Sequence, residues 1–172
     1  MSILKILFDI CLLRGQPQDL PASKNLVALT ALLSIASTYT LDHLHQEILR
    51  GLVFAASQTA LLGAVVWVAL AIRGYTERWL QTIAPLFAAA TLVDVIKWLV
   101  VASVLGHEAS APGPWLTGFI LVIAMWFIAI MAHVLRHALA LSMALAVLVS
   151  LGCVLASGMA MILLFPEVIP RP

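Results

Sequence analysis

The chain has 172 residues, of which 63% are hydrophobic and only 10% are charged, and its formal net charge is +1. Soluble domains carry about 25% charged residues and about 45–50% apolar ones, and a water-soluble protein of this size could not hide so much apolar surface. The composition therefore predicts an integral membrane protein, and the near-zero charge excludes the concentrated basic patch that a nucleic-acid partner requires.

Residues 1–22 predict a short helix on the membrane surface, followed by a linker. Ser2, Lys5 and Asp9 form one polar stripe at helical spacing among apolar neighbours, which is typical of a helix in the headgroup plane. Gly15 ends this amphipathic helix, and GQPQDLP supplies a proline-bracketed linker. We expect the segment to anchor the first span, with docking of another protein as the alternative.

Five stretches are long and apolar enough to cross a bilayer, which takes about 20 residues of helix. Ser23 is expected to cap the first of them. A break is expected at His133, Arg136 and His137, because one helix over 115–165 would be about 75 Å long. The prediction is an all-α membrane bundle at 23–165, with a short outer tail at 166–172. Its spans are 23–41, 48–72, 82–105, 115–135 and 138–165.

The distribution of Lys and Arg predicts the orientation. If the N-terminus is cytoplasmic, six of these residues lie inside and two lie outside. The positive-inside rule then places the N-terminus in the cytoplasm and the C-terminus outside, which is the periplasm for a protein of a bacterial inner membrane. The inside residues are Lys5, Arg14, Lys24, Arg73, Arg78 and Arg136, and the outside residues are Arg50 and Arg171.

Asp94 and Lys97 stand near the middle of the third predicted span, in TLVDVIKWLV. A charge at the centre of a membrane helix costs about 2.5–3.5 kcal/mol on insertion scales, whereas each Leu, Ile, Val or Phe returns only about 0.3–0.6 kcal/mol. Facing lipid, the pair would cancel most of the insertion energy of its span. We therefore expect this helix to lie among the others, with both charges turned inward and paired.

Further polar residues are predicted at the same depth. We expect Gln58 of the second span to join Asp94 and Lys97, with Ser34 and Ser150 nearby. Three interpretations stay open: a self-neutralising pair that sets helix register, an ion or solute site, and a contact with a partner membrane protein. The fourth span has no polar residue in its middle, so we expect it to be the lipid-facing helix.

Two segments resemble metal sites superficially. In the outer loop LDHLHQEILR the spacing is irregular, and only His43 and Glu47 share a helical face. His133 and His137 share a face beside Arg136, but two imidazoles do not complete a zinc site, and contact with lipid headgroups suits this cluster better. The sequence predicts no metal and no cofactor.

Small residues recur at four-residue intervals on two predicted spans. Such ridges let helices approach closely, so we expect internal packing, with self-association as the alternative. The first ridge is Gly152, Ala156 and Ala160, and the second is Ala56, Ala60 and Ala64. No HExxH, GxSxG or phosphate-loop motif is present, so we expect no enzymatic activity.

The short N-terminal segment, the five closely spaced spans and the outside C-terminus resemble the YIP family of five-pass membrane proteins and its bacterial relatives. The stretch ILFDICLLRGQPQDLPAS is also similar to small proteobacterial inner-membrane proteins. The acidic-tyrosine-glycine signature of the eukaryotic family is missing ahead of the helices, so no functional residue is carried over. The resemblance implies a compact five-helix fold and a role in organising membrane partners.

These observations predict a non-enzymatic accessory or scaffold protein of the inner membrane, which contacts lipid and either other membrane proteins or a second copy of itself. The alternative is a small transporter, or an ion- or proton-conducting protein, that uses Asp94, Lys97 and Gln58. A water-filled cavity that reaches Asp94 from either face of the membrane would favour the alternative, whereas a pair in a dry interior would favour the scaffold.

Overall fold

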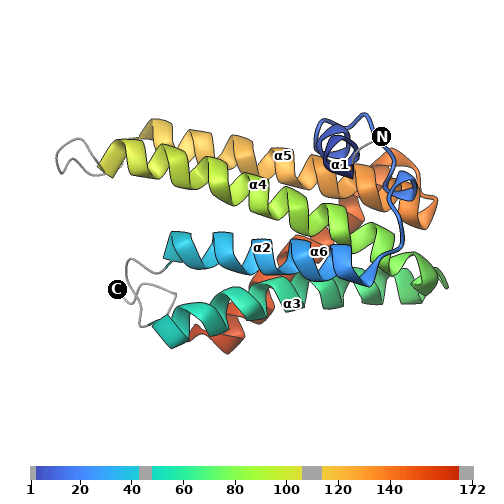
Figure 1. Cartoon of the computed structure of the whole chain (residues 1–172), viewed down its shortest axis with the longest axis horizontal. Coiled ribbons are helices and arrows are strands. Elements are labelled where there is room, and N and C mark those ends of the chain that lie inside the picture. The colour runs from blue at the N-terminus through green and yellow to red at the C-terminus, as the bar shows by residue number, and fades with distance from the viewer. Residues whose placement is uncertain (1–2, 43–47, 106–113, 167–172) are drawn as a thin grey trace.

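A computed structural model of the chain shows a bundle of α-helices and describes residues 3–42, 48–105 and 114–166, in which no strand occurs. Successive long helices are antiparallel. Helix α1 lies at one end of the bundle, and α6 ends at the opposite end (Figure 1). In chain order the elements are α1 Ile3–Cys11, η1 Pro17–Asp19, α2 Lys24–Asp42, α3 Ile48–Ile72, η3 Thr76–Arg78, α4 Trp79–Leu105, α5 Pro114–Leu139 and α6 Met143–Leu164.

Four of the described helices, α3, α4, α5 and α6, are long and apolar enough to cross a membrane. They support the multi-pass membrane protein that the composition predicts. Helix α2 has 19 residues but is richer in Ser and Thr, and it does not reach the same apolarity. The fifth span therefore stays a prediction. At the start of α2, Ser23 acts as the predicted cap, since its Oγ accepts a hydrogen bond from the Leu26 N–H at 3.3 Å.

The predicted break at His133, Arg136 and His137 is wrong in position, because these residues lie in the last turns of α5. The chain turns instead at residues 140–142, where Ala140 adopts the left-handed conformation with φ of 52°. The Leu141 N–H then donates to the Arg136 carbonyl at 3.0 Å, which closes the end of the helix. Ser142 is the N-cap of α6, and its side chain accepts a hydrogen bond from the Leu145 N–H. No glycine or proline marks this turn, which is why the sequence did not locate it.

Ala140→Gly is expected to stabilise the protein by about 0.5–1 kcal/mol, because glycine adopts the left-handed conformation without the steric cost of a Cβ atom. The measurement is the free energy of unfolding in mixed detergent micelles. Ala144→Gly is the matched control, since Ala144 lies on the exposed face of α6. Glycine should destabilise that regular position by a similar amount. Equal effects at both sites would contradict the assigned turn.

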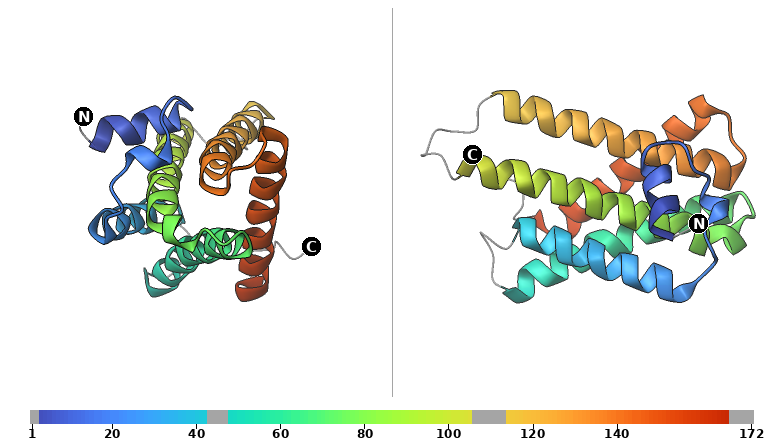
Figure 2. Two further views of the ribbon diagram at one scale, coloured as in Figure 1. Left: turned by 90° about the vertical axis from the view of Figure 1, so that its right-hand side faces the viewer. Right: turned by 45° about the horizontal axis from the view of Figure 1, so that its top comes forward.

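The densest packing lies at the α1 end of the bundle. Helices α4 and α5 meet there, and α1 lies across them, as the end view in Figure 2 shows. Ile83 and Leu86 of α4 and Met131 and Leu135 of α5 are fully buried. The expectation that the fourth span faces lipid is therefore wrong for its C-terminal half. Apolar residues without polar neighbours pack as readily against other helices as against lipid, so composition could not decide between them.

Candidate functional site

Asp94 and Lys97 form an ion pair on α4, as predicted. The Lys97 Nζ lies 2.9 Å from Oδ1 of Asp94, and the i, i+3 spacing lets both side chains lie on one helix face. The side chain of Asp94 is only 10% exposed, against 33% for Lys97. The carboxylate is therefore held inside the bundle, whereas the ammonium group is partly open.

Two hydroxyls of α2 complete the surroundings of the carboxylate. Thr38 donates from Oγ1 to Oδ2 of Asp94 at 2.9 Å, and the Ser37 Oγ lies 3.4 Å from the same oxygen while its shorter hydrogen bond, of 3.0 Å, goes to the Ser34 carbonyl. Asp94, Ser37 and Thr38 are all buried. Sequence reasoning missed both hydroxyls, because counting from the span midpoints placed them nearer the outer end than Asp94. The extensive packing of α2 against α4 brings them together.

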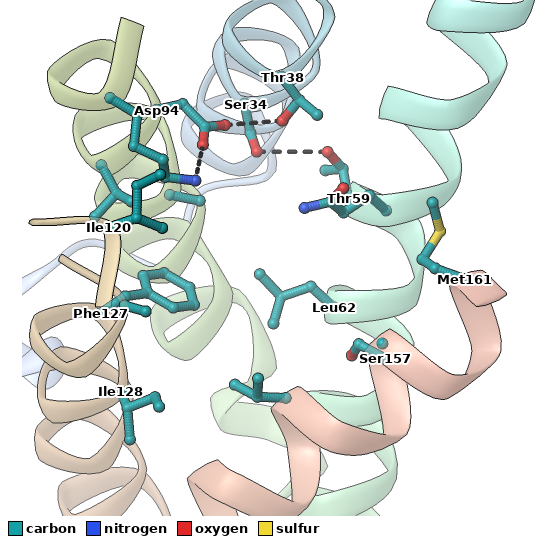
Figure 3. A pocket seen from close by; sticks show the side chains of 17 residues that line it. Ser34, Thr38, Thr59, Leu62, Asp94, Ile120, Phe127, Ile128, Ser157 and Met161 are labelled. Atoms are coloured by element: carbon teal, nitrogen blue, oxygen red, sulfur yellow. Dashed lines mark hydrogen bonds and ion pairs between the residues drawn. The ribbon is translucent and has the colours of Figure 1, made fainter. Parts of the chain in front are cut away.

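The charged pair borders a cavity of about 370 Å³. All five long helices contribute to its lining, for example through Thr38, Gln58, Asp94, Phe127 and Ser157. Figure 3 shows the hydrogen bonds of Asp94 at one end of this space, Phe127 on the α5 wall and Ser157 on the α6 wall. The cavity therefore has a polar end at Asp94 and largely apolar walls elsewhere.

The structure brings four of the five residues of the predicted cluster to this cavity. Gln58 and Ser34 line it together with Asp94 and Lys97, and Ser34 lies 3.4 Å from the hydroxyl of Thr59. Ser150 does not line it. Its Oγ instead donates to the Ala146 carbonyl of its own helix at 2.8 Å. Ser150 lies on the same face of α6 as Val154 and Ser157, but one turn nearer the start of the helix, so its depth keeps it out of the cavity.

Comparisons with family models, with curated proteins and with solved structures gave no match for this chain. The chemistry of the site is therefore argued from its own residues. Within the described ranges no group of three or more His, Cys, Asp or Glu side chains converges as metal ligands would. The outer loop with His43 and Glu47 lies outside the described residues.

The His133 side chain contacts the N-terminal segment of the same chain, and the predicted headgroup contact of His133, Arg136 and His137 stays a prediction. Its Nε2 lies 2.8 Å from the Gly15 carbonyl, and its ring meets that of His137 edge-on with centroids 4.9 Å apart. Gln18 Nε2 donates to the His137 carbonyl at 3.5 Å. Arg136 is exposed, and His137 is half-buried.

Cys11 is the last residue of α1 and belongs to the same N-terminal segment. It is a free thiol and almost fully buried, and burial raises its pKa from 9.0 to about 11. The neutral thiol is the form that the fold favours, so its contribution to stability is complete below pH 9 and is lost as pH rises toward and beyond 11.

We expect the wild type to lose about 2 kcal/mol more stability than Cys11→Ala between pH 8 and pH 11. Only the wild type carries this thiol, so the difference between the two pH profiles isolates its ionisation from that of other groups. Free energies of unfolding measured in the same detergent test it. Parallel profiles would show that the thiol is not buried as described.

His133→Ala is expected to raise the rate of Cys11 alkylation by N-ethylmaleimide about fivefold, because a lost hydrogen bond of about 1 kcal/mol makes opening of the N-terminal segment more frequent. Mass spectrometry of the labelled chain measures the rate. Arg136→Ala is the control on the same turn, since Arg136 is exposed, and it should leave the rate unchanged. An equal increase in both variants would show that the His133–Gly15 contact does not hold the N-terminal segment against α5.

The small-residue ridges do not pack inside the chain, contrary to expectation. Gly152 and Ala156 of α6 are exposed and Ala160 is half-buried. A Cβ atom at Gly152 would meet no atom of another segment within 4 Å. The second ridge, Ala56, Ala60 and Ala64 of α3, is exposed along its length.

Proposed function

We propose that this protein is a multi-pass protein of a bacterial inner membrane that binds a small solute in the Asp94–Lys97 cavity and moves it across the bilayer. The observation that carries the proposal is the cavity of about 370 Å³ at the ion pair. A pair that served only to set helix register would gain from dry, close packing, since pairing compensates the desolvation of two charges only when the geometry is complete.

The partly exposed ammonium of Lys97 supports this proposal. Charged residues within membrane helices are costly, and they commonly mark solute or ion pathways. Here all five long helices meet at the cavity, so a small displacement of any one of them would change access to it. Ligand pockets commonly occupy about 300–1,000 Å³, and this cavity lies at the small end of that range.

The orientation is part of the proposal. The start of α2 and the ends of α3 and α5 lie at the α1 end of the bundle, and the start of α3 lies at the opposite end (Figure 1). By these bounds the α1 end carries Lys5, Arg14, Lys24, Arg73 and Arg136, whereas Arg50 belongs to the opposite end. By the positive-inside rule, the α1 end faces the cytoplasm. The polar end of the cavity, with Thr38 close to the end of α2, then lies nearer the periplasm.

A second candidate is the non-enzymatic accessory or scaffold role that the sequence favoured. The exposed ridge of Gly152 and Ala156 supports it, because small residues on an outer face allow a helix of another protein to approach closely. The topological resemblance to the YIP family points in the same direction and stays a prediction.

Cysteine accessibility tests the first candidate against the second. Gln58→Cys and Ser157→Cys place thiols in the cavity, and Ala60→Cys places a matched thiol on the exposed face of α3. We expect a membrane-impermeant maleimide to label the two cavity thiols in both right-side-out and inside-out vesicles, and to leave Ala60→Cys unlabelled. Labelling from one side only would refute transport while keeping a binding site. Labelling from neither side would favour the scaffold.

A further inference from the structure

The carboxylate of Asp94 has little remaining capacity to accept hydrogen bonds from a ligand. Oδ1 accepts from Lys97, and Oδ2 accepts from Thr38 and lies 3.4 Å from the Ser37 hydroxyl. The side chain is also mostly buried. A ligand that needed this carboxylate as an acceptor for its own donors would have to displace one of these three partners.

Donors, in contrast, are in surplus at the cavity. An ammonium group has three N–H bonds, and the structure directs one of those of Lys97 to Asp94. The Oγ of Ser157 is buried on the α6 wall and has no hydrogen-bond partner among the described residues. Buried hydroxyls almost always have a partner, so this orphan points to an acceptor group that occupies the cavity.

The charge balance of the cavity argues against an ion. Asp94 and Lys97 neutralise one another, and no other charged side chain lines the described walls. An anion or a cation bound there would leave one charge without a counter-charge in a region of low dielectric, which carries a large desolvation cost. A neutral molecule avoids that cost.

The remaining walls are apolar. Leu62, Phe127, Ile128 and Val154 enclose the space beyond the polar end. Figure 3 shows Leu62 between the Ser34–Thr59 pair and Ser157, so apolar surface separates the polar end from the orphan hydroxyl. Apolar lining with a few placed polar groups is the usual pattern of sites for small, largely apolar molecules.

We propose that the ligand of this cavity is a neutral, largely apolar molecule with carbonyl oxygens, which accept hydrogen bonds from Lys97 and from the Ser157 hydroxyl. This inference rests on the proposed function, because it names the class of solute for the same site. Two sources share this chemistry, a fatty ester and a quinone, and the choice of probes separates them.

The test measures equilibrium binding to the purified full-length chain in lipid nanodiscs, corrected with empty nanodiscs. Methyl decanoate, decanoate and decylammonium share a chain and differ in the charge of the head, and menadione presents two carbonyls on a rigid ring. We expect methyl decanoate or menadione to bind at least about tenfold more tightly than either ion. Preference for menadione would identify a quinone-like ligand, and preference for the ester an acyl ester.

Ser157→Ala should weaken binding of the preferred neutral probe about fivefold, because it removes one donor to the carbonyl. Ser150→Ala is the matched control, since that hydroxyl is bonded within its own helix and should leave binding unchanged. The combined change Asp94→Asn with Lys97→Met keeps the cavity neutral, removes the ammonium donor and should weaken binding about tenfold or more.

The outcomes separate the two proposals. Tighter binding of decanoate or decylammonium, still sensitive to Ser157→Ala, would overturn the neutral ligand while keeping the cavity as the site. Labelled cavity thiols together with no binding of any probe would also overturn the ligand class alone. Absence of both labelling and binding would overturn the proposed function itself.

Discussion

Lys97→Met alone is expected to lower the free energy of unfolding by about 3 kcal/mol, because it leaves the buried Asp94 carboxylate without its counter-ion. Losses of about 3–5 kcal/mol are typical when one partner of a buried pair is removed. The lower value is expected here because the Lys97 side chain is 33% exposed and part of its interaction is screened by water.

The double variant, Asp94→Asn with Lys97→Met, should return to within about 1 kcal/mol of the wild type, since replacing both partners of a buried pair by neutral groups is often nearly neutral. Asp94→Asn alone should cost about 1–3 kcal/mol, because an amide oxygen still accepts from Thr38 but no longer neutralises the ammonium. The three variants together form a double-mutant cycle whose coupling term isolates the pair.

Unfolding in mixed micelles of denaturing and mild detergent gives these free energies. Lys24→Met is the control, because Lys24 is exposed at the start of α2 and should change stability by less than about 0.5 kcal/mol. If the effects of the two single changes simply add in the double variant, Asp94 and Lys97 are not energetically coupled.

Gly158→Leu is expected to block access to the cavity and ligand binding there while preserving the fold. Gly158 lines the cavity, and a Cβ atom there would meet no atom of another segment within 4 Å, so a leucine side chain has room to enter. Filling the space should reduce both the labelling rate of Gln58→Cys and the affinity for a neutral probe at least about tenfold. Stability should not fall, because leucine favours the helix over glycine by about 0.8–1 kcal/mol.

Gly152→Leu is the matched control on the same helix. Gly152 is equally open but does not line the cavity, so this change should leave labelling and binding at the wild-type level. It does place a bulky side chain on the exposed ridge and would disrupt close association through that face. Multi-angle light scattering in detergent measures the association. Wild-type binding in Gly158→Leu would show that the cavity is not the ligand site.

Several features of the fold follow from local or energetic rules, and these were predictable. Long apolar runs predict membrane helices because a bilayer core sets their length, and Ser23 marks a helix start because its side chain satisfies a free backbone N–H. The inward pairing of Asp94 with Lys97 follows from the cost of exposing charges to lipid. Equal depth also predicted Gln58 and Ser34 at the same site.

The contacts between elements were not predictable in this way. Ser37 and Thr38 lie at Asp94 only because α2 packs along α4, and Ser150 misses the cavity because the lining of α6 begins one turn later, at Val154. In a soluble protein the alternation of polar and apolar residues shows which face of a helix is buried. In a membrane bundle the outer face is as apolar as the core, so that information is missing from the sequence.

The amino-acid sequence by itself therefore determined that this protein is a bundle of membrane helices with a neutralised pair of charges in its interior. Insertion energy depends on the residues of each span and not on their neighbours in space, which makes this conclusion independent of the tertiary structure. Only the tertiary structure decided that the pair opens on a cavity, and that Ser157 faces this cavity with no hydrogen-bond partner in the described part of the chain. It also decided that the turn after α1 contacts α5 through Gly15 and His133. These features depend on how helices of nearly uniform apolarity rotate and pack against one another, and close packing together with hydrogen bonds between helices sets that arrangement.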